Sequence, residues 1–264
     1  MVPKERLVNM YQVKVDPHTH TIYSGHAFST VGENAAEAAR LGLEGIGMTD
    51  HFGIMTPRKE GGQLDLGPLM NKAALPPRVY GVRVLQGVEI DIMDFNGELA
   101  FWHDEAQFGG KGLSIGEMVL KTRDLVIASL HFFPGCRTGN VQMNTQMYIG
   151  ALENPYVDIL GHPCRPGVPF EMREVVRAAR DNGKFLEINE HSFDTTEAVP
   201  RCRELAICCA EENCPVVVSS DAHSAWMIGQ FPRVFEMFAE IGFPQALIAN
   251  ESLEKMARLR GKEW

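Results

Sequence analysis

The sequence lacks several features that define common protein classes. No apolar run approaches the roughly 20 residues of a membrane-spanning helix, and the opening MVPKERLVNMYQV holds no apolar segment typical of a signal peptide. The six cysteines form no C-x-x-C pair, and four of them fall in one expected helix and its end. This pattern indicates small buried residues in a reducing compartment, so we expect a cytoplasmic protein without a cysteine metal site.

Positive charge is also in short supply. The 25 Lys and Arg residues are outnumbered by 34 Asp and Glu residues, which gives a net charge of −9. An acidic surface disfavours nonspecific binding to nucleic acid, so we expect no stable nucleic-acid partner. Linkers rich in Pro and Ser, blocks of charge and internal repeats are lacking too, which predicts a single domain over residues 1–264, with an oligomer possible.

The sequence does contain a regular alternation of short β-rich runs and amphipathic segments. The seven expected strands are 12–15, 45–48, 82–90, 125–130, 157–161, 185–189 and 215–220. The expected helices are 33–42, 115–123, 142–154, 171–183 and 200–213, with further helices over about 226–260. Strand–helix alternation with near-continuous apolar strands predicts an α/β fold with a parallel sheet. Seven units favour a TIM-like barrel, and an open doubly wound sheet is the alternative.

Most of the nine histidines lie where an expected strand ends. The polar residues at or just after these strand ends are Asp16, His18, His20, His51, Glu89, His131, His162, Asp221 and His223, and His26 follows six residues after His20. In a barrel of parallel strands the carboxyl ends meet on one face, so these side chains are expected to converge. Asp16 is a candidate to orient a histidine ligand from behind. His103 and His191 fit the pattern less well and are interpreted as ordinary loop residues.

The ordered set D-x-H-x-H, T-D-H, G-x-E, a lone His, G-H-P and S-D-A-H, from Asp16 to His223, resembles the PHP (polymerase and histidinol phosphatase) family. The stretches HTIYSGHAFST (20–30), NTQM (144–147) and LEIN (186–189) are similar to its YcdX-like branch of single-domain phosphoesterases. The resemblance implies a distorted seven-unit (β/α) barrel that holds three metal ions at its strand ends. It also implies a hydrolase that acts on phosphate ester bonds.

The resemblance further implies a ligand set, residue by residue. The first metal would be bound by His18, His20, Glu89 and Asp221, the second by Glu89, His131 and His162, and the third by His26, His51 and His223. Glu89 would bridge two ions, and Glu89, Asp221 and His223 are the expected catalytic residues. Imidazole and carboxylate ligands without thiolate suit Zn²⁺, Mn²⁺ or Fe²⁺, and the resemblance favours zinc.

The expected reaction is hydrolysis of small phosphate monoesters by a metal-activated hydroxide, because zinc lowers the pKa of bound water to about 7. Arg165, three residues after His162, and Arg137, six residues after His131, are candidate phosphate clamps, with a solvated loop arginine as the alternative for each. Two other functions stay open. One is a histidinol-phosphatase-like enzyme or a phosphoesterase for nucleotides or nucleic-acid ends, and the other is a metal-binding protein without turnover.

Overall fold

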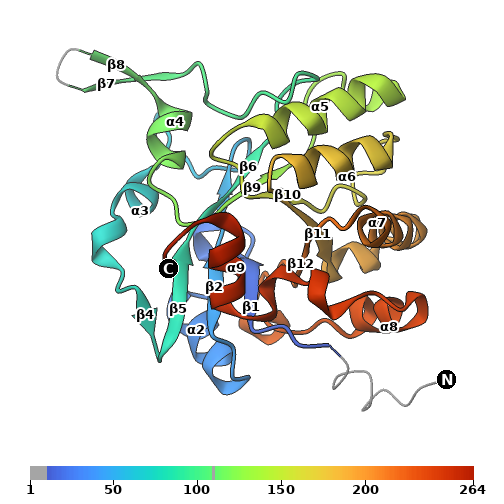
Figure 1. Cartoon of the computed structure of the whole chain (residues 1–264). Coiled ribbons are helices and arrows are strands. Elements are labelled where there is room, and N and C mark those ends of the chain that lie inside the picture. Colours follow the sequence, from blue (N-terminus) through green and yellow to red (C-terminus); the bar gives the residue numbers. More distant parts are fainter. Residues whose placement is uncertain (1–10, 109–110) are drawn as a thin grey trace.

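The computed structural model describes residues 11–108 and 111–264. Figure 1 shows mainly parallel strands with helices packed around them. The expectation about a signal peptide falls mostly on residues 1–10 and lies outside the described residues. No helix in the described ranges is long and apolar enough to span a membrane.

The strands form two main sheets and a separate hairpin. The first sheet holds β1 (Val15–Thr19), β2 (Gly45–Met48) and β5 (Val82–Gln86) in parallel, with β4 (Arg78–Val79) antiparallel to β5. The second sheet is entirely parallel and holds β3 (His51–Phe52), β6 (Val88–Asp91), β9 (Val126–Ser129), β10 (Ile159–Gly161), β11 (Phe185–Asn189) and β12 (Val216–Ser219). The hairpin consists of β7 (Glu105–Phe108) and β8 (Lys111–Ser114).

The expected single strand 82–90 is in fact two strands, β5 and β6, which belong to different sheets. The chain changes partners at Gly87, whose N–H donates to Met48, while the next residue, Val88, donates to Leu125. A Cβ at Gly87 would lie 2.6 Å from the carbonyl oxygen of Leu125, so only glycine fits this close approach. The continuous apolar pattern of 82–90 concealed the change of sheet.

The outer strands β1 and β12 lie side by side, and the Asn250 side chain supplies part of the link between them. Thr19 and Ala222 form an isolated parallel bridge. The Asn250 amide donates to the carbonyl oxygens of Val15 at 2.7 Å and Val218 at 2.6 Å, and it accepts from the Val218 N–H at 3.0 Å. The parallel α/β fold is therefore confirmed, whereas a continuous ladder that closes the barrel is not detected in the described part of the chain.

The helices agree with the predicted segments to within a few residues, except that no helix was predicted over 67–70. They are α2 (Val31–Arg40), α3 (Gly67–Met70), α4 (Ile115–Leu120), α5 (Val141–Glu153), α6 (Met172–Asp181), α7 (Ala198–Glu212), α8 (Pro232–Ile241) and α9 (Leu253–Arg260). Short 3₁₀ turns are η1 (Ile22–Ser24), η2 (Lys72–Ala74), η3 (Cys136–Thr138), η4 (Glu190–Asp194), η5 (Ala225–Met227), η6 (Gln245–Leu247) and η7 (Ala249–Glu251). Helix α2 begins with a reciprocal capping box between Thr30 and Glu33.

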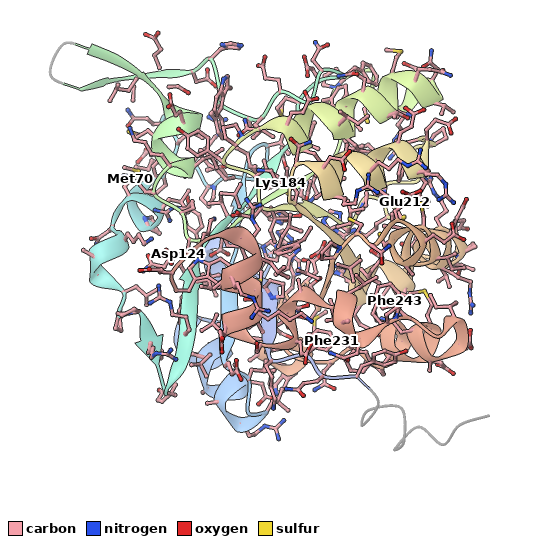
Figure 2. The ribbon with its side chains drawn as sticks, viewed as in Figure 1. Met70, Asp124, Lys184, Glu212, Phe231 and Phe243 are labelled. Carbon is pink, nitrogen blue, oxygen red and sulfur yellow. The ribbon has the colours of Figure 1, made fainter. Side chains whose placement is uncertain are left out.

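The core lies between the parallel strands and the surrounding helices, where side chains fill the space (Figure 2). Helices α5, α6 and α7 pack in succession along one side of the sheet (Figure 1). All six cysteines are buried and free, as expected of small apolar core residues. This packing leaves the carboxyl ends of the parallel strands to carry polar side chains.

Candidate metal centre

The nine expected ligands all come from the carboxyl ends of the parallel strands or from the loops that follow. His18 lies in β1, His51 begins β3 and Glu89 lies in β6, whereas His20, His26, His131, His162, Asp221 and His223 lie in the segments just after β1, β9, β10 and β12. Two of them have left-handed backbone conformations, His162 with φ 26° and Asp221 with φ 54°. Such strain at non-glycine residues persists where the surrounding structure enforces it, often at functional sites.

The carboxylate of Glu89 lies at the middle of the cluster and is almost completely buried. Its oxygens are close to five imidazole nitrogens: His162 Nε2 at 2.7 Å, His51 Nδ1 at 2.9 Å, His18 Nε2 at 3.4 Å, and His20 Nε2 and His131 Nε2 at 3.5 Å. One carboxylate surrounded by this many imidazole nitrogens is arranged as a bridge between cations. A purely structural carboxylate would be satisfied by one or two hydrogen bonds.

Hydrogen bonds at Nδ1 fix the direction in which five of the histidines face. The Nδ1 partners are Glu187 for His18 (2.7 Å), Ser24 Oγ for His20 (3.0 Å), Ser24 O for His26 (3.0 Å), Asp91 for His131 (2.6 Å) and Asp221 O for His223 (2.9 Å). The Ser24 hydroxyl donates to Asp50 at 2.6 Å, so it accepts from His20. In each case Nδ1 carries the proton, and the Nε2 lone pair is left for a cation in the cluster.

The residues fit divalent ions. His18 Nε2 lies 3.1 Å from His20 Nε2, and His26 Nε2 lies 2.8 Å from His223 Nε2. Facing lone pairs repel unless a cation lies between them, and bonds of about 2.0–2.1 Å to a tetrahedral zinc place its nitrogen ligands about 3.3 Å apart. In addition, Glu89 Oε2, His51 Nε2 and Asp221 Oδ1 are buried and have no hydrogen-bond partner among the described residues.

The cluster separates into overlapping groups of three donors. Four of these groups are His18–His20–Asp221, His18–Glu89–His162, His51–Glu89–His131 and His20–His51–His223, each with its donor atoms within 4.8 Å of one another. These groups partly reproduce the expected ligand sets. They differ in that His51 approaches Glu89 as well as the group around His223.

Electrostatics keep the two carboxylates charged and the His20 imidazole neutral. Burial opposes ionisation of Glu89, but His131 and His18 outweigh it and hold the pKa of Glu89 well below its usual range. The pKa of Asp221 is likewise held low, against its burial, by His18 and Arg165. Burial lowers the pKa of His20 to about 3. This imidazole is therefore neutral at pH 7, the form that binds metal.

The two candidate phosphate clamps differ in position. Arg165 reaches the cluster, where Nη1 donates to Asp221 at 2.5 Å and Nη2 lies 2.9 Å from His162 Nε2. The Arg137 guanidinium instead stacks on the ring of Phe132 at 4.4 Å. Arg165 is thus placed to meet an anion at the cluster, and the role of Arg137 stays a prediction.

Two interpretations of single residues need correction. Asp16 orients no histidine: its carboxylate accepts from the N–H and hydroxyl of Ser220 at 3.0 and 2.5 Å and from the Gly229 N–H at 2.9 Å. His191 is more than an ordinary loop residue, since its Nδ1 lies 3.6 Å from Asp221 Oδ2. His103 does lie apart from the cluster, exposed and paired with Glu98.

The sequence did not predict which carboxylates orient the histidines. Glu187 in β11 accepts from His18 Nδ1, from the His162 N–H at 2.6 Å and from the Ser219 hydroxyl at 2.6 Å. Asp91, at the end of β6, binds His131 Nδ1. The available signal was an acidic residue inside each apolar run, FLEIN and VEID, where an unpaired charge would be costly.

The parallel α/β fold gathers histidines and buried carboxylates at its strand ends. This arrangement is the type of site found in metal-dependent hydrolases. The comparison with known families agrees. A PHP domain model matches residues 16–191, and a PHP-associated model matches residues 201–250. The chain therefore belongs to the PHP family.

Individual relatives cover nearly the whole chain. A probable phosphatase of Acetivibrio thermocellus is 39% identical over 243 residues, covering 91% of this chain and 92% of the relative. A probable phosphatase of Caldanaerobacter subterraneus subsp. tengcongensis is 39% identical over 251 residues, covering 92% and 89%. Among solved structures, histidinol phosphate phosphatase from Lactococcus lactis, complexed with zinc, L-histidinol and phosphate, matches with a TM-score of 0.62 and 19% identity, covering 88% and 94%. This last likeness supports the fold.

Proposed function

We propose that the protein is a metal-dependent phosphoesterase that hydrolyses small phosphate monoesters at a trinuclear centre. The observation that carries this proposal is the gathering of five imidazoles around Glu89, of which His18, His20 and His131 have their Nε2 lone pairs directed inward. The phosphatase names of the PHP relatives support the same class, a hydrolase of phosphate esters. The proposed ligands are His18, His20, His26, His51, Glu89, His131, His162, Asp221 and His223.

When bound, the divalent ions, by proposal zinc, supply a water of lowered pKa and neutralise the phosphate charge. The residues of the chain itself orient the metal ligands and hold the phosphate. Glu187 and Asp91 keep the His18 and His131 rings in the tautomer that presents Nε2. Arg165 offers two guanidinium nitrogens beside Asp221 and His162, from where it can hold a phosphate oxygen. Asp221 and His223 fix the edge of the centre nearest His191.

Several finer features belong to the same proposal. We propose that the sheet acts as a distorted seven-unit barrel, supported by the side-chain link between β1 and β12, and that residues 1–264 form one domain of the YcdX-like branch. Histidinol phosphate is a second candidate substrate, because the Lactococcus lactis structure holds histidinol and phosphate. A metal-binding protein without turnover would show the same ligands and no chelator-sensitive hydrolysis.

The decisive experiment uses Glu89→Gln, which keeps the shape of the side chain and removes its charge. If Glu89 bridges two ions, the purified variant should hold about two fewer bound ions than the wild type and lose hydrolysis of a chromogenic phosphate monoester. Replacing the exposed Glu105 with Gln is the matched control and should change neither metal content nor activity. Full metal occupancy in Glu89→Gln would contradict the bridge, and a wild type without chelator-sensitive hydrolysis would contradict the enzyme.

A further inference from the structure

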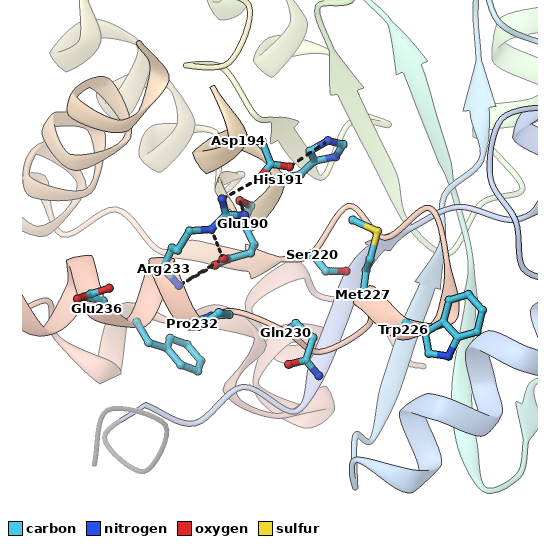
Figure 3. Close-up of a pocket in the computed structure, with 11 residues that line it drawn as sticks. Glu190, His191, Asp194, Ser220, Trp226, Met227, Gln230, Pro232, Arg233 and Glu236 are labelled. Carbon is cyan, nitrogen blue, oxygen red and sulfur yellow. Dashed lines mark hydrogen bonds and ion pairs between the residues drawn. The ribbon is translucent and has the colours of Figure 1, made fainter. Parts of the chain in front are cut away.

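A cavity of about 390 Å³ lies beside the candidate metal centre, and we call it the side pocket (Figure 3). Its apolar wall consists of Trp226 and Met227 from η5 and Pro232 and Phe235 from α8. A mainly apolar wall with a few polar groups is typical of cavities that bind small organic molecules. The proposed hydrolysis leaves this cavity without a role.

The side pocket and the metal centre share a wall. His191 lines the side pocket, and its Nδ1 lies 3.6 Å from Asp221 Oδ2. The His191 ring centroid is 5.9 Å from that of His223. Ser220, which also lines the side pocket, directly precedes Asp221 in the chain. The side pocket therefore adjoins the edge of the metal centre that Asp221 and His223 form.

The charges in the side pocket disfavour a second phosphate there. Arg233 is the only Lys or Arg among its lining residues, and its guanidinium is already engaged. Its Nε donates to Glu190 at 2.7 Å and its Nη1 donates to Asp194 at 2.6 Å, as the dashed lines in Figure 3 show. Glu236 adds a further carboxylate to the lining. The side pocket therefore suits a group that carries no negative charge.

An exposed indole in the lining favours a flat ring. Trp226 is 84% exposed, the largest exposed fraction among the bulky apolar residues that the structure describes. An indole face of this size gains from stacking on an aromatic ring, in addition to the area that both bury. We propose that the side pocket binds the alcohol part of the ester and selects an aromatic ring that carries no negative charge. This proposal rests on the proposed phosphoesterase function and adds a substrate class to it.

The test compares benzyl phosphate with cyclohexylmethyl phosphate on the metal-loaded full chain. Both are esters of primary alcohols of similar size, so they differ mainly in whether the ring is flat and aromatic. Stacking on Trp226 predicts a kcat/KM about 3- to 10-fold higher for benzyl phosphate. In Trp226→Ala this ratio should fall to about one, chiefly through a higher KM for benzyl phosphate. Trp226→Phe should retain most of the preference for benzyl phosphate.

Phe28→Ala is the matched control. Phe28 is an aromatic residue of similar exposure, 82%, and its N–H donates to the carbonyl oxygen of His223, but it does not line the side pocket. This variant should leave the ratio unchanged, and an equal loss in it would overturn the assignment to the side pocket. A wild-type ratio near one, or an unchanged ratio in Trp226→Ala, would overturn the subsite and leave the phosphoesterase standing. Failure to hydrolyse either ester with any metal would overturn both.

Discussion

Replacing Glu187 with Gln tests whether the carboxylate behind His18 sets the metal affinity of the centre. Glu187 accepts three short hydrogen bonds, from His18 Nδ1 at 2.7 Å, the His162 N–H at 2.6 Å and the Ser219 hydroxyl at 2.6 Å. An amide keeps one acceptor oxygen and turns the other position into a donor. At least one of the three donors therefore faces another donor, inside a site that excludes water.

The expected cost follows from these contacts. A hydrogen bond to a charged group contributes about 1.5–3 kcal/mol, and loss of a carboxylate behind a ligating histidine lowers metal affinity by about 10- to 100-fold. We therefore expect Glu187→Gln to bind zinc at least about tenfold more weakly in a competition titration against a chromogenic chelator. A dissociation constant within about twofold of the wild type would refute the reasoning.

Asp158→Asn is the matched control for a buried carboxylate. Asp158 is also fully buried, but it lies before β10, at the opposite end of the strands, where it accepts from the Val126 N–H, Arg260 and Lys262. This variant should lower the free energy of unfolding and leave zinc affinity unchanged. The pair thus separates a loss of fold stability from a loss of metal affinity.

Three further predictions concern stability. Removing metal with a chelator should lower the Tm, since ligand at about 100 times its Kd stabilises by about 2.7 kcal/mol; an unchanged Tm in scanning fluorimetry would contradict a loaded site. Burial, aided by Arg260, lowers the pKa of Lys184 to about 8, so its folded state disfavours the proton. Between about pH 8 and about 10.4, the pKa of lysine in the unfolded chain, the wild type should therefore gain stability relative to Lys184→Met as the pH rises. Urea titrations can measure this difference, and a difference that does not change with pH would refute the prediction. Gly87→Ala places a methyl 2.6 Å from the Leu125 oxygen. It should destabilise by about 1–3 kcal/mol in chemical denaturation, and an unchanged midpoint would argue against the close approach.

The position of the site could be predicted because it depends on a pattern visible in the chain. His131, His162 and Asp221 each follow an apolar strand, and parallel strands bring their carboxyl ends together whatever the sequence distance. The residues that orient the ligands were harder to find. Glu187 lies within its strand, and only its burial shows that its charge needs partners. His191 lies in a 3₁₀ turn, where no periodicity indicates the direction of a side chain.

The division of the fold into two sheets could not be predicted for a similar reason. Apolar periodicity reports burial, and residues on both sides of Gly87 are buried, so the pattern of 82–90 continues across the change of partner. The link between β1 and β12 depends in part on the side chain of Asn250, far along the chain from Val15. Single-sequence reasoning has no means of pairing these two residues.

The Asn250 link also has a consequence for the order of folding. His18 lies in β1 and His20 directly follows it, and Asp221 follows β12, so the centre lies across the junction that Asn250 helps to hold together. His18 and His20 cannot be held firmly beside Asp221 until the segment around residue 250 has left the ribosome and has docked. Contacts over such a sequence separation form slowly. We therefore expect the nascent chain to acquire its full affinity for metal only after the segment around residue 250 has been synthesised and has docked.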